Sequence, residues 1–229
     1  MREIFKQEME QLREGLVAMS GSVATAIEKA TTALRTADLT LAEEVIDADR
    51  QIDALERELD EHGISLLARQ QPVATDLRIV VSGLRLSATL ERMGDLARHI
   101  ADVARGRYPE TATTGRMQEI LDRMGEQATK VGRQVNQLLE TRDLELAAAI
   151  ERDDDIIDRL HRESFQVVLD DNEALTRQQL VDSVLLGRYL ERFGDHGVSV
   201  ARRVSYLVTG DPANAVHLTK VSEEPAHLD

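Results

Sequence analysis

The second half of this chain repeats the first. The segment TADLTLAEEVIDADRQIDALERE, which starts at Thr36, aligns with TRDLELAAAIERDDDIIDRLHRE, which starts at Thr141. Farther along, LERMGDLARHIA from Leu90 aligns with LERFGDHGVSVA from Leu190. Self-similarity over this length indicates a tandem duplication, with a seam near residues 106–113. Both halves must therefore adopt the same fold.

Each half is expected to contain three helices. Apolar residues recur seven apart, as in the series Val45, Ile52, Leu59 and Leu66, which is typical of helices packed nearly antiparallel in a bundle. The predicted helices are 3–36, 38–70, 74–105, 114–141, 143–170 and 175–208. We therefore predict an all-α protein made of two tandem three-helix bundles, at residues 1–108 and 114–208. Residues 209–229 lack periodicity and are predicted to form a disordered tail.

Turn and capping residues set the predicted helix boundaries. Asp38 and Asp143 are suited to N-cap positions, and each precedes an apolar periodic run. Thr176 and Gln179 have the spacing of a capping box. Pro72 ends the second predicted helix of the first half.

Composition excludes several classes of function. The chain has no cysteine, so it has neither disulfides nor zinc–thiolate sites. A net charge of −14 and an aromatic content of 3% disfavour nucleic-acid binding, because phosphates would be repelled and bases would find few stacking partners. No apolar run approaches the roughly 20 residues of a membrane helix, and the start MREIFKQEME has no signal-peptide core. We therefore expect a cytoplasmic protein without direct membrane insertion.

Acidic residues four positions apart recur at corresponding places in both halves. The pairs are Asp49 with Asp53, Glu91 with Asp95, Asp154 with Asp158, and Glu191 with Asp195. Residues i and i+4 share a helix face, and the second and third helices of a bundle are neighbours. The four carboxylates of each half are therefore expected to converge on one outward-facing patch, away from the apolar seams.

Clustered carboxylates repel one another, by on the order of 4 kcal/mol for a close pair at an effective dielectric near 20. A bound multivalent cation removes this cost, and carboxylate oxygens favour hard ions such as magnesium, manganese and ferric iron. The eight acids are therefore candidate metal ligands. The alternative is a solvated helix face on a metal-free helical scaffold. His99 and His161 have no counterparts in the other half and are expected to be surface residues, whereas Gly94 and Gly194 suggest a close approach by a neighbour.

The motif PVATDLRIVVSGLRLSATLERMGDLARHIA from Pro72 resembles the signature of the PhoU family. VLLGRYLERFGDHGVSVARRVSYLVTGD from Val184 resembles the family's second copy, most closely in its actinobacterial branch. The resemblance implies two three-helix bundles related by a pseudo-two-fold axis. It also implies metal binding at the eight acids, by iron, manganese, zinc or magnesium.

The resemblance further implies a regulator of phosphate uptake and phosphate-starvation signalling, without catalysis. Such a protein would link the phosphate ABC transporter, chiefly its ATPase subunit, to a sensor histidine kinase, and would repress the starvation response when phosphate is plentiful. A homodimer is also implied, for which Leu77, Val80 and Leu84 offer apolar positions. A carboxylate-bridged di-metal oxidase is the enzymatic alternative, although only Asp158 and His161 approach the Glu-x-x-His spacing of those sites.

Overall fold

The computed structural model describes residues 2–170 and 173–211, which form six α-helices without strands in these ranges. The helices are α1 (Arg2–Thr36), α2 (Leu39–Gln70), α3 (Ala74–Arg107), α4 (Gly115–Thr141), α5 (Leu144–Val168) and α6 (Arg177–Thr209). The all-α prediction is confirmed, and every predicted helix is present with closely similar bounds. Most of the predicted tail, from residue 212 onward, lies outside the described residues. No helix in the described part of the chain is long and apolar enough to cross a membrane.

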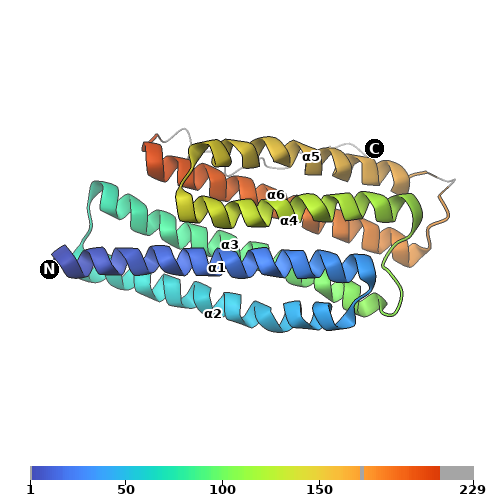
Figure 1. The fold of residues 1–229 in the computed structure, drawn as a ribbon, viewed down its shortest axis with the longest axis horizontal. Helices are drawn as coiled ribbons and strands as arrows, with labels where there is room; N and C mark the ends of the chain where they lie inside the picture. Colours follow the sequence, from blue (N-terminus) through green and yellow to red (C-terminus); the bar gives the residue numbers. More distant parts are fainter. Residues whose placement is uncertain (1, 171–172, 212–229) are drawn as a thin grey trace, which may run out of the picture.

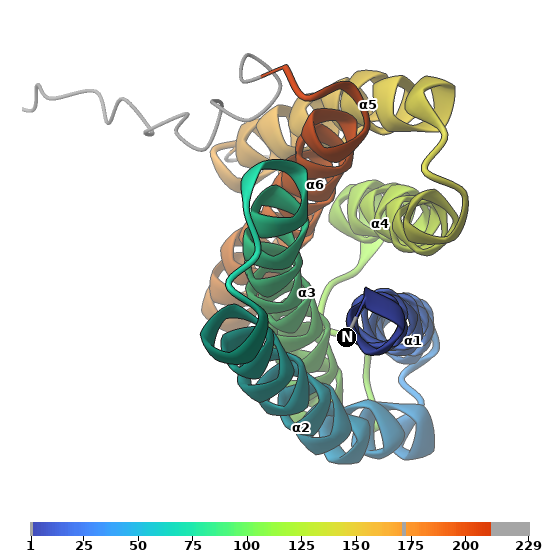
Figure 2. The same cartoon turned by 90° about the vertical axis from the view of Figure 1, so that its left-hand side faces the viewer.

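The helices of each half contact one another, so each half is a three-helix bundle. Contacts join all pairs among α1, α2 and α3, and all pairs among α4, α5 and α6. Between the halves, α1 packs against α4 and α3 packs against α6, with the long axes roughly aligned (Figure 1). Viewed along the helices, α2, α3, α6 and α5 follow one another in a curved outer layer, and α1 and α4 lie on its concave side (Figure 2).

The predicted capping residues begin the helices as expected. Asp38 accepts a hydrogen bond from the backbone N–H of Leu41 at 3.0 Å, and Asp143 accepts one from that of Glu145 at 2.8 Å. Thr176 and Gln179 complete the capping box, in which each side chain accepts from the other residue's backbone N–H. These bonds satisfy N–H groups that have no partner inside the helix, which fixes where the helices start.

The apolar seams read from the sequence form the core. Val45, Ile52, Leu59 and Leu66 on α2 are all buried, as are Leu86, Leu90, Met93 and Ile100 on α3. Val80, one of the three candidate positions for a dimer surface, is also completely buried inside the chain. That part of the dimer prediction is wrong, because Val80 packs within the monomer's own core; Leu77 remains exposed.

An ion pair between a partly exposed arginine and a buried aspartate joins the two halves. Arg107 near the end of α3 donates two hydrogen bonds to the carboxylate of Asp182 near the start of α6, at 2.5 Å from Nε and 3.0 Å from Nη2. Only 2% of the Asp182 side chain is exposed. Because the end of one helix pairs with the start of the other, α3 and α6 run antiparallel. The ring of His99 on α3 lies 5.2 Å from that of Tyr189 on α6, consistent with the same arrangement.

Candidate functional site

The structure brings the four predicted acids of the first half together between α2 and α3. Asp53 and Asp95 both raise the pKa of Asp49, and they also raise the pKa of Glu91. Burial is the largest cause of both shifts, because a carboxylate loses hydration when it is enclosed. We call Asp49, Asp53, Glu91 and Asp95 the first acidic cluster.

Arginine side chains neutralise much of the first acidic cluster. Arg98 on α3 lies 2.6 Å from Asp49, 2.9 Å from Asp95 and 3.4 Å from Asp102, measured between guanidinium nitrogens and carboxylate oxygens. Arg92 lies 3.3 Å from Asp95 and 3.5 Å from Glu91. Arg98 therefore bridges α2 and α3, and its charge offsets the repulsion that the sequence predicts.

The corresponding acids of the second half also lie between two helices, α5 and α6. Burial first, and then the charges of Asp195 and Asp158, raise the pKa of Glu191 to about 7. Arg188 opposes this rise by binding both Glu191 oxygens, at 2.9 and 2.8 Å. Asp154 lies on the neighbouring α5, facing Gly194 of α6. We call Asp154, Asp158, Glu191 and Asp195 the second acidic cluster.

The carboxylates are more enclosed than the helical periodicity predicted. Asp49 is buried, and only 14% of the Glu191 side chain is exposed, whereas we expected outward-facing acids. Two glycines explain the difference. A Cβ on Gly194 would lie 2.6 Å from Oδ1 of Asp154, and one on Gly94 would lie 3.1 Å from the side chain of Ile52 and 3.7 Å from Asp49. The close approach predicted for these glycines is thus made by the facing helix, which places Asp49 next to Gly94 and Asp154 next to Gly194.

His99 and His161 are partly buried, whereas we expected them to be surface residues. Nδ1 of His99 and Nε2 of His161 are both buried without a hydrogen-bond partner. His161 packs 4.9 Å from the ring of Phe165, and burial lowers its pKa. His99 packs against Tyr189 of α6, and His161 packs against Gly187 of the same helix.

The side chains in the described residues do not form a ready metal site. No group of three or more acidic or histidine side chains in residues 2–170 and 173–211 converges on a point where an ion would be held. Carboxylates are suitable donors for hard cations, but in the observed rotamers Asp49 and Asp95 of the first acidic cluster turn oxygens toward Arg98. Metal binding therefore stays a prediction, which in the first acidic cluster requires Arg98 to be displaced.

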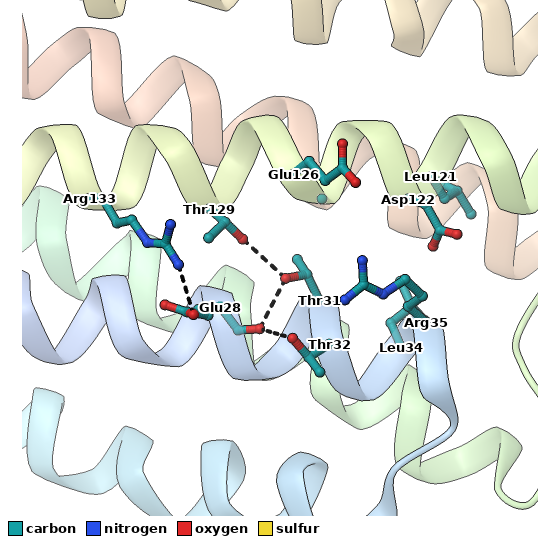
Figure 3. A pocket seen from close by; sticks show the side chains of 11 residues that line it. Glu28, Thr31, Thr32, Leu34, Arg35, Leu121, Asp122, Glu126, Thr129 and Arg133 are labelled. Atoms are coloured by element: carbon teal, nitrogen blue, oxygen red, sulfur yellow. Dashed lines mark hydrogen bonds and ion pairs between the residues drawn. The ribbon is translucent and has the colours of Figure 1, made fainter.

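A groove outside the acidic clusters runs between α1 and α4 on the concave side (Figure 3). Its volume is about 320 Å³. Arg133 pairs with Glu28 across it at 2.8 Å, and the hydroxyls of Thr31 and Thr129 lie 3.2 Å apart (Figure 3). These polar groups satisfy one another across the groove, so they link α1 to α4.

The sequence already suggested that Arg92 neutralises nearby carboxylates, which its contacts with Glu91 and Asp95 confirm, but sequence reasoning missed Arg98. Arg98 follows Asp95 by three positions and precedes Asp102 by four, which is the spacing of helical ion pairs. That signal was available from the sequence. The contact from Arg98 to Asp49 was not, because it depends on how α2 and α3 are rotated against each other.

Comparison with known protein families gives two matches within this chain. The PhoU domain model matches residues 16–104 and again residues 121–204. Each match covers most of one of the two bundles and includes one acidic cluster.

Similar proteins cover almost the whole chain. A Mycobacterium tuberculosis protein named phosphate-specific transport system accessory protein PhoU homolog 2 is 40% identical over 92% of this chain and 99% of its own length. The Pseudomonas aeruginosa homolog of the accessory protein is 34% identical over 96% of this chain and 91% of its length. The crystal structure of PhoU from Pseudomonas aeruginosa superposes with a TM-score of 0.82 at 33% identity, over 90% of this chain and all of that one.

Proposed function

The chain belongs to the PhoU family, and from that premise we propose that it is a non-enzymatic accessory protein of phosphate transport. The observation that carries the proposal is the match to accessory proteins, which covers nearly the full length of this chain and of each matched protein, including both repeats. We further propose that it acts in the cytoplasm, contacting the ATPase subunit of the phosphate ABC transporter and a sensor histidine kinase. In this role it represses the phosphate-starvation response at high phosphate, as a homodimer.

We also propose that the two acidic clusters bind hard cations such as manganese, iron, zinc or magnesium. The support is the clustering of carboxylates across two helices, with pKa values of Asp49, Glu91 and Glu191 raised by burial and by their acidic neighbours. A cation would supply the positive charge that favours ionised carboxylates in such a place. In the first acidic cluster it must compete with Arg98.

The two clusters should differ in affinity. Val198 stands at the position in α6 that corresponds to Arg98 in α3. A cation entering the first acidic cluster must displace Arg98 from Asp49 and Asp95, which costs two charge-assisted hydrogen bonds or ion pairs. In the second acidic cluster a cation must displace Arg188, but Arg188 binds the single carboxylate of Glu191, whereas Arg98 binds two. We therefore expect tighter binding in the second acidic cluster.

Titration of chelator-treated protein with Mn²⁺ tests the metal proposal. We expect two classes of site in calorimetry, and affinity at the tighter one about tenfold lower at pH 6 than at pH 8, because Glu191 must release its proton. Arg98→Met should tighten the weaker class, and Glu191→Gln should remove the tighter one. Equal affinity at both pH values, or no binding at millimolar Mn²⁺, would contradict this assignment.

The regulatory role is tested in cells that lack the gene. We expect the deletion strain to express phosphate-starvation genes at high phosphate, and wild-type protein to restore repression. Tagged protein should co-purify with the transporter's ATPase subunit. Normal repression of the phosphate-starvation genes in a strain without the gene would refute the regulatory role. A Glu44→Ala variant, altered at an exposed ion pair with Lys29, serves as the matched complementation control.

A further inference from the structure

Three arginines gather where the first half of α3 meets the end of α6. Arg78 and Arg85 come from α3, and Arg203 comes from α6. The guanidinium carbon of Arg78 lies 5.4 Å from the ring centre of Tyr206, and its Nη1 would lie 2.7 Å from a Cβ on Gly210. Gly210 caps α6 in the left-handed conformation, so it leaves the room that Arg78 occupies. We call Arg78, Arg85 and Arg203 the arginine cluster.

The arginine cluster has no carboxylate ion pair in the part of the chain that the structure describes. Within residues 2–170 and 173–211, no ion pair joins Arg78, Arg85 or Arg203 to an acidic side chain. Arg203 exposes only 8% of its surface, and Nε of Arg78 is buried without a hydrogen-bond partner. Burial and the nearby charge of Arg85 lower the pKa of Arg203, which is the direction expected for crowded cations.

Other arginines on α3 are paired with carboxylates. Arg98 contacts three aspartates and Arg107 forms a two-bond pair with Asp182. In a chain of net charge −14, acidic side chains are abundant, yet in the described ranges none of them forms an ion pair with these three arginines. An enclosed guanidinium without an anion costs folding free energy, and a bound anion would recover it.

We propose that the arginine cluster is a binding site for a small tetrahedral oxyanion, with inorganic phosphate as the ligand. Guanidinium groups present paired N–H donors that match oxyanion geometry, and two or more arginines suit a dianion. Because Arg203 is recessed between the helices, a ligand that contacts both it and the exposed Arg85 must be small. The choice of phosphate over other oxyanions rests on the proposed function; the site itself does not, and it lies apart from both acidic clusters.

Calorimetric titration of the full chain with inorganic phosphate tests the site. A chelator is present throughout, so that phosphate cannot bind through a cation at the carboxylates. We expect saturable binding of one phosphate per chain, weakened about tenfold or more by Arg85→Gln, because an exposed donor to the anion is lost. Arg123→Gln, an equal charge change on the exposed surface of α4, should bind like the wild type.

Arg203→Gln should abolish binding, with folding checked by circular dichroism; if it fails to fold, Arg85→Gln alone decides. Sulfate that competes with phosphate would support an oxyanion site. The proposal is overturned if phosphate does not bind the wild-type chain, or if Arg85→Gln and Arg123→Gln bind equally. It is also overturned if a glutamate-rich peptide binds where phosphate does not, which would assign the surface to an acidic protein partner. Phosphate binding by a protein that does not complement the deletion strain would separate this site from the proposed function.

Discussion

An Asp182→Ala variant is expected to unfold with a free energy about 3 kcal/mol below that of the wild type. Asp182 is almost completely buried, where it accepts two hydrogen bonds from Arg107 and one from Gln178 at 3.1 Å. Removing the carboxylate leaves the Arg107 guanidinium, two-thirds buried, without its anion at the seam between the two halves. For a protein of this size the loss corresponds to a melting temperature lower by about 10 °C.

Two further variants show whether the effect belongs to this ion pair. Glu44→Ala breaks an exposed pair with Lys29 at 2.7 Å and should cost less than about 1 kcal/mol. The double variant Arg107→Met/Asp182→Leu should recover most of the stability, because a buried pair is often replaceable by apolar side chains. Urea denaturation followed by circular dichroism measures all three. If Asp182→Ala costs no more than Glu44→Ala, the pair does not hold the halves together.

The second large effect concerns pH. A Glu191→Gln variant, kept free of metal, is expected to be more stable than the wild type at pH 8 by about 1 to 3 kcal/mol, and nearly equal to it at pH 4.5. The folded pKa of Glu191 is raised to about 7, so the folded state holds a proton that the unfolded chain has already released. Wild-type stability therefore falls as pH rises from about 4.5 through 7. Glutamine does not ionise, so it removes this fall.

The difference between variant and wild type at each pH isolates Glu191 from the other titrating groups. Urea denaturation at pH 4.5, 6 and 8 gives this difference directly. Glu58→Gln, an exposed glutamate on α2, is the matched control and should show no such dependence. A stability difference that stays constant from pH 4.5 to 8 would mean that Glu191 ionises normally in the folded chain.

The sequence predicted the helices and the pairing of the acids. Heptad spacing and the capping residues Asp38, Asp143 and Thr176 placed all six helices, because both signals are local and act within one or two turns. The duplicated motifs indicated that α2 with α3, and α5 with α6, would bring their acids together. In agreement with this, burial and then the charges of neighbouring acids raise the pKa values of Asp49, Glu91 and Glu191.

The sequence alone could not predict how deeply the acids are enclosed or which cations face them. Helical periodicity gives the direction of a side chain from its own helix axis, but exposure depends on the neighbouring helix. Gly94 and Gly194 let that neighbour approach until Asp49 and Asp154 lie against the glycine backbone. The same close packing carries Arg98 onto Asp49.

The sequence by itself determined that this protein is a doubled three-helix bundle with two carboxylate clusters. Hydrophobic periodicity, capping residues and repeats can be recognised from the order of residues along the chain, without knowing which distant residues are in contact. Only the tertiary structure decided which charges are paired. It brought Arg107 to Asp182 across the seam, and it left Arg78, Arg85 and Arg203 without an ion pair to a carboxylate among the described residues. The physical reason is that ion pairing depends on angstrom-scale placement of side chains from different helices, and that placement is fixed by how the core packs.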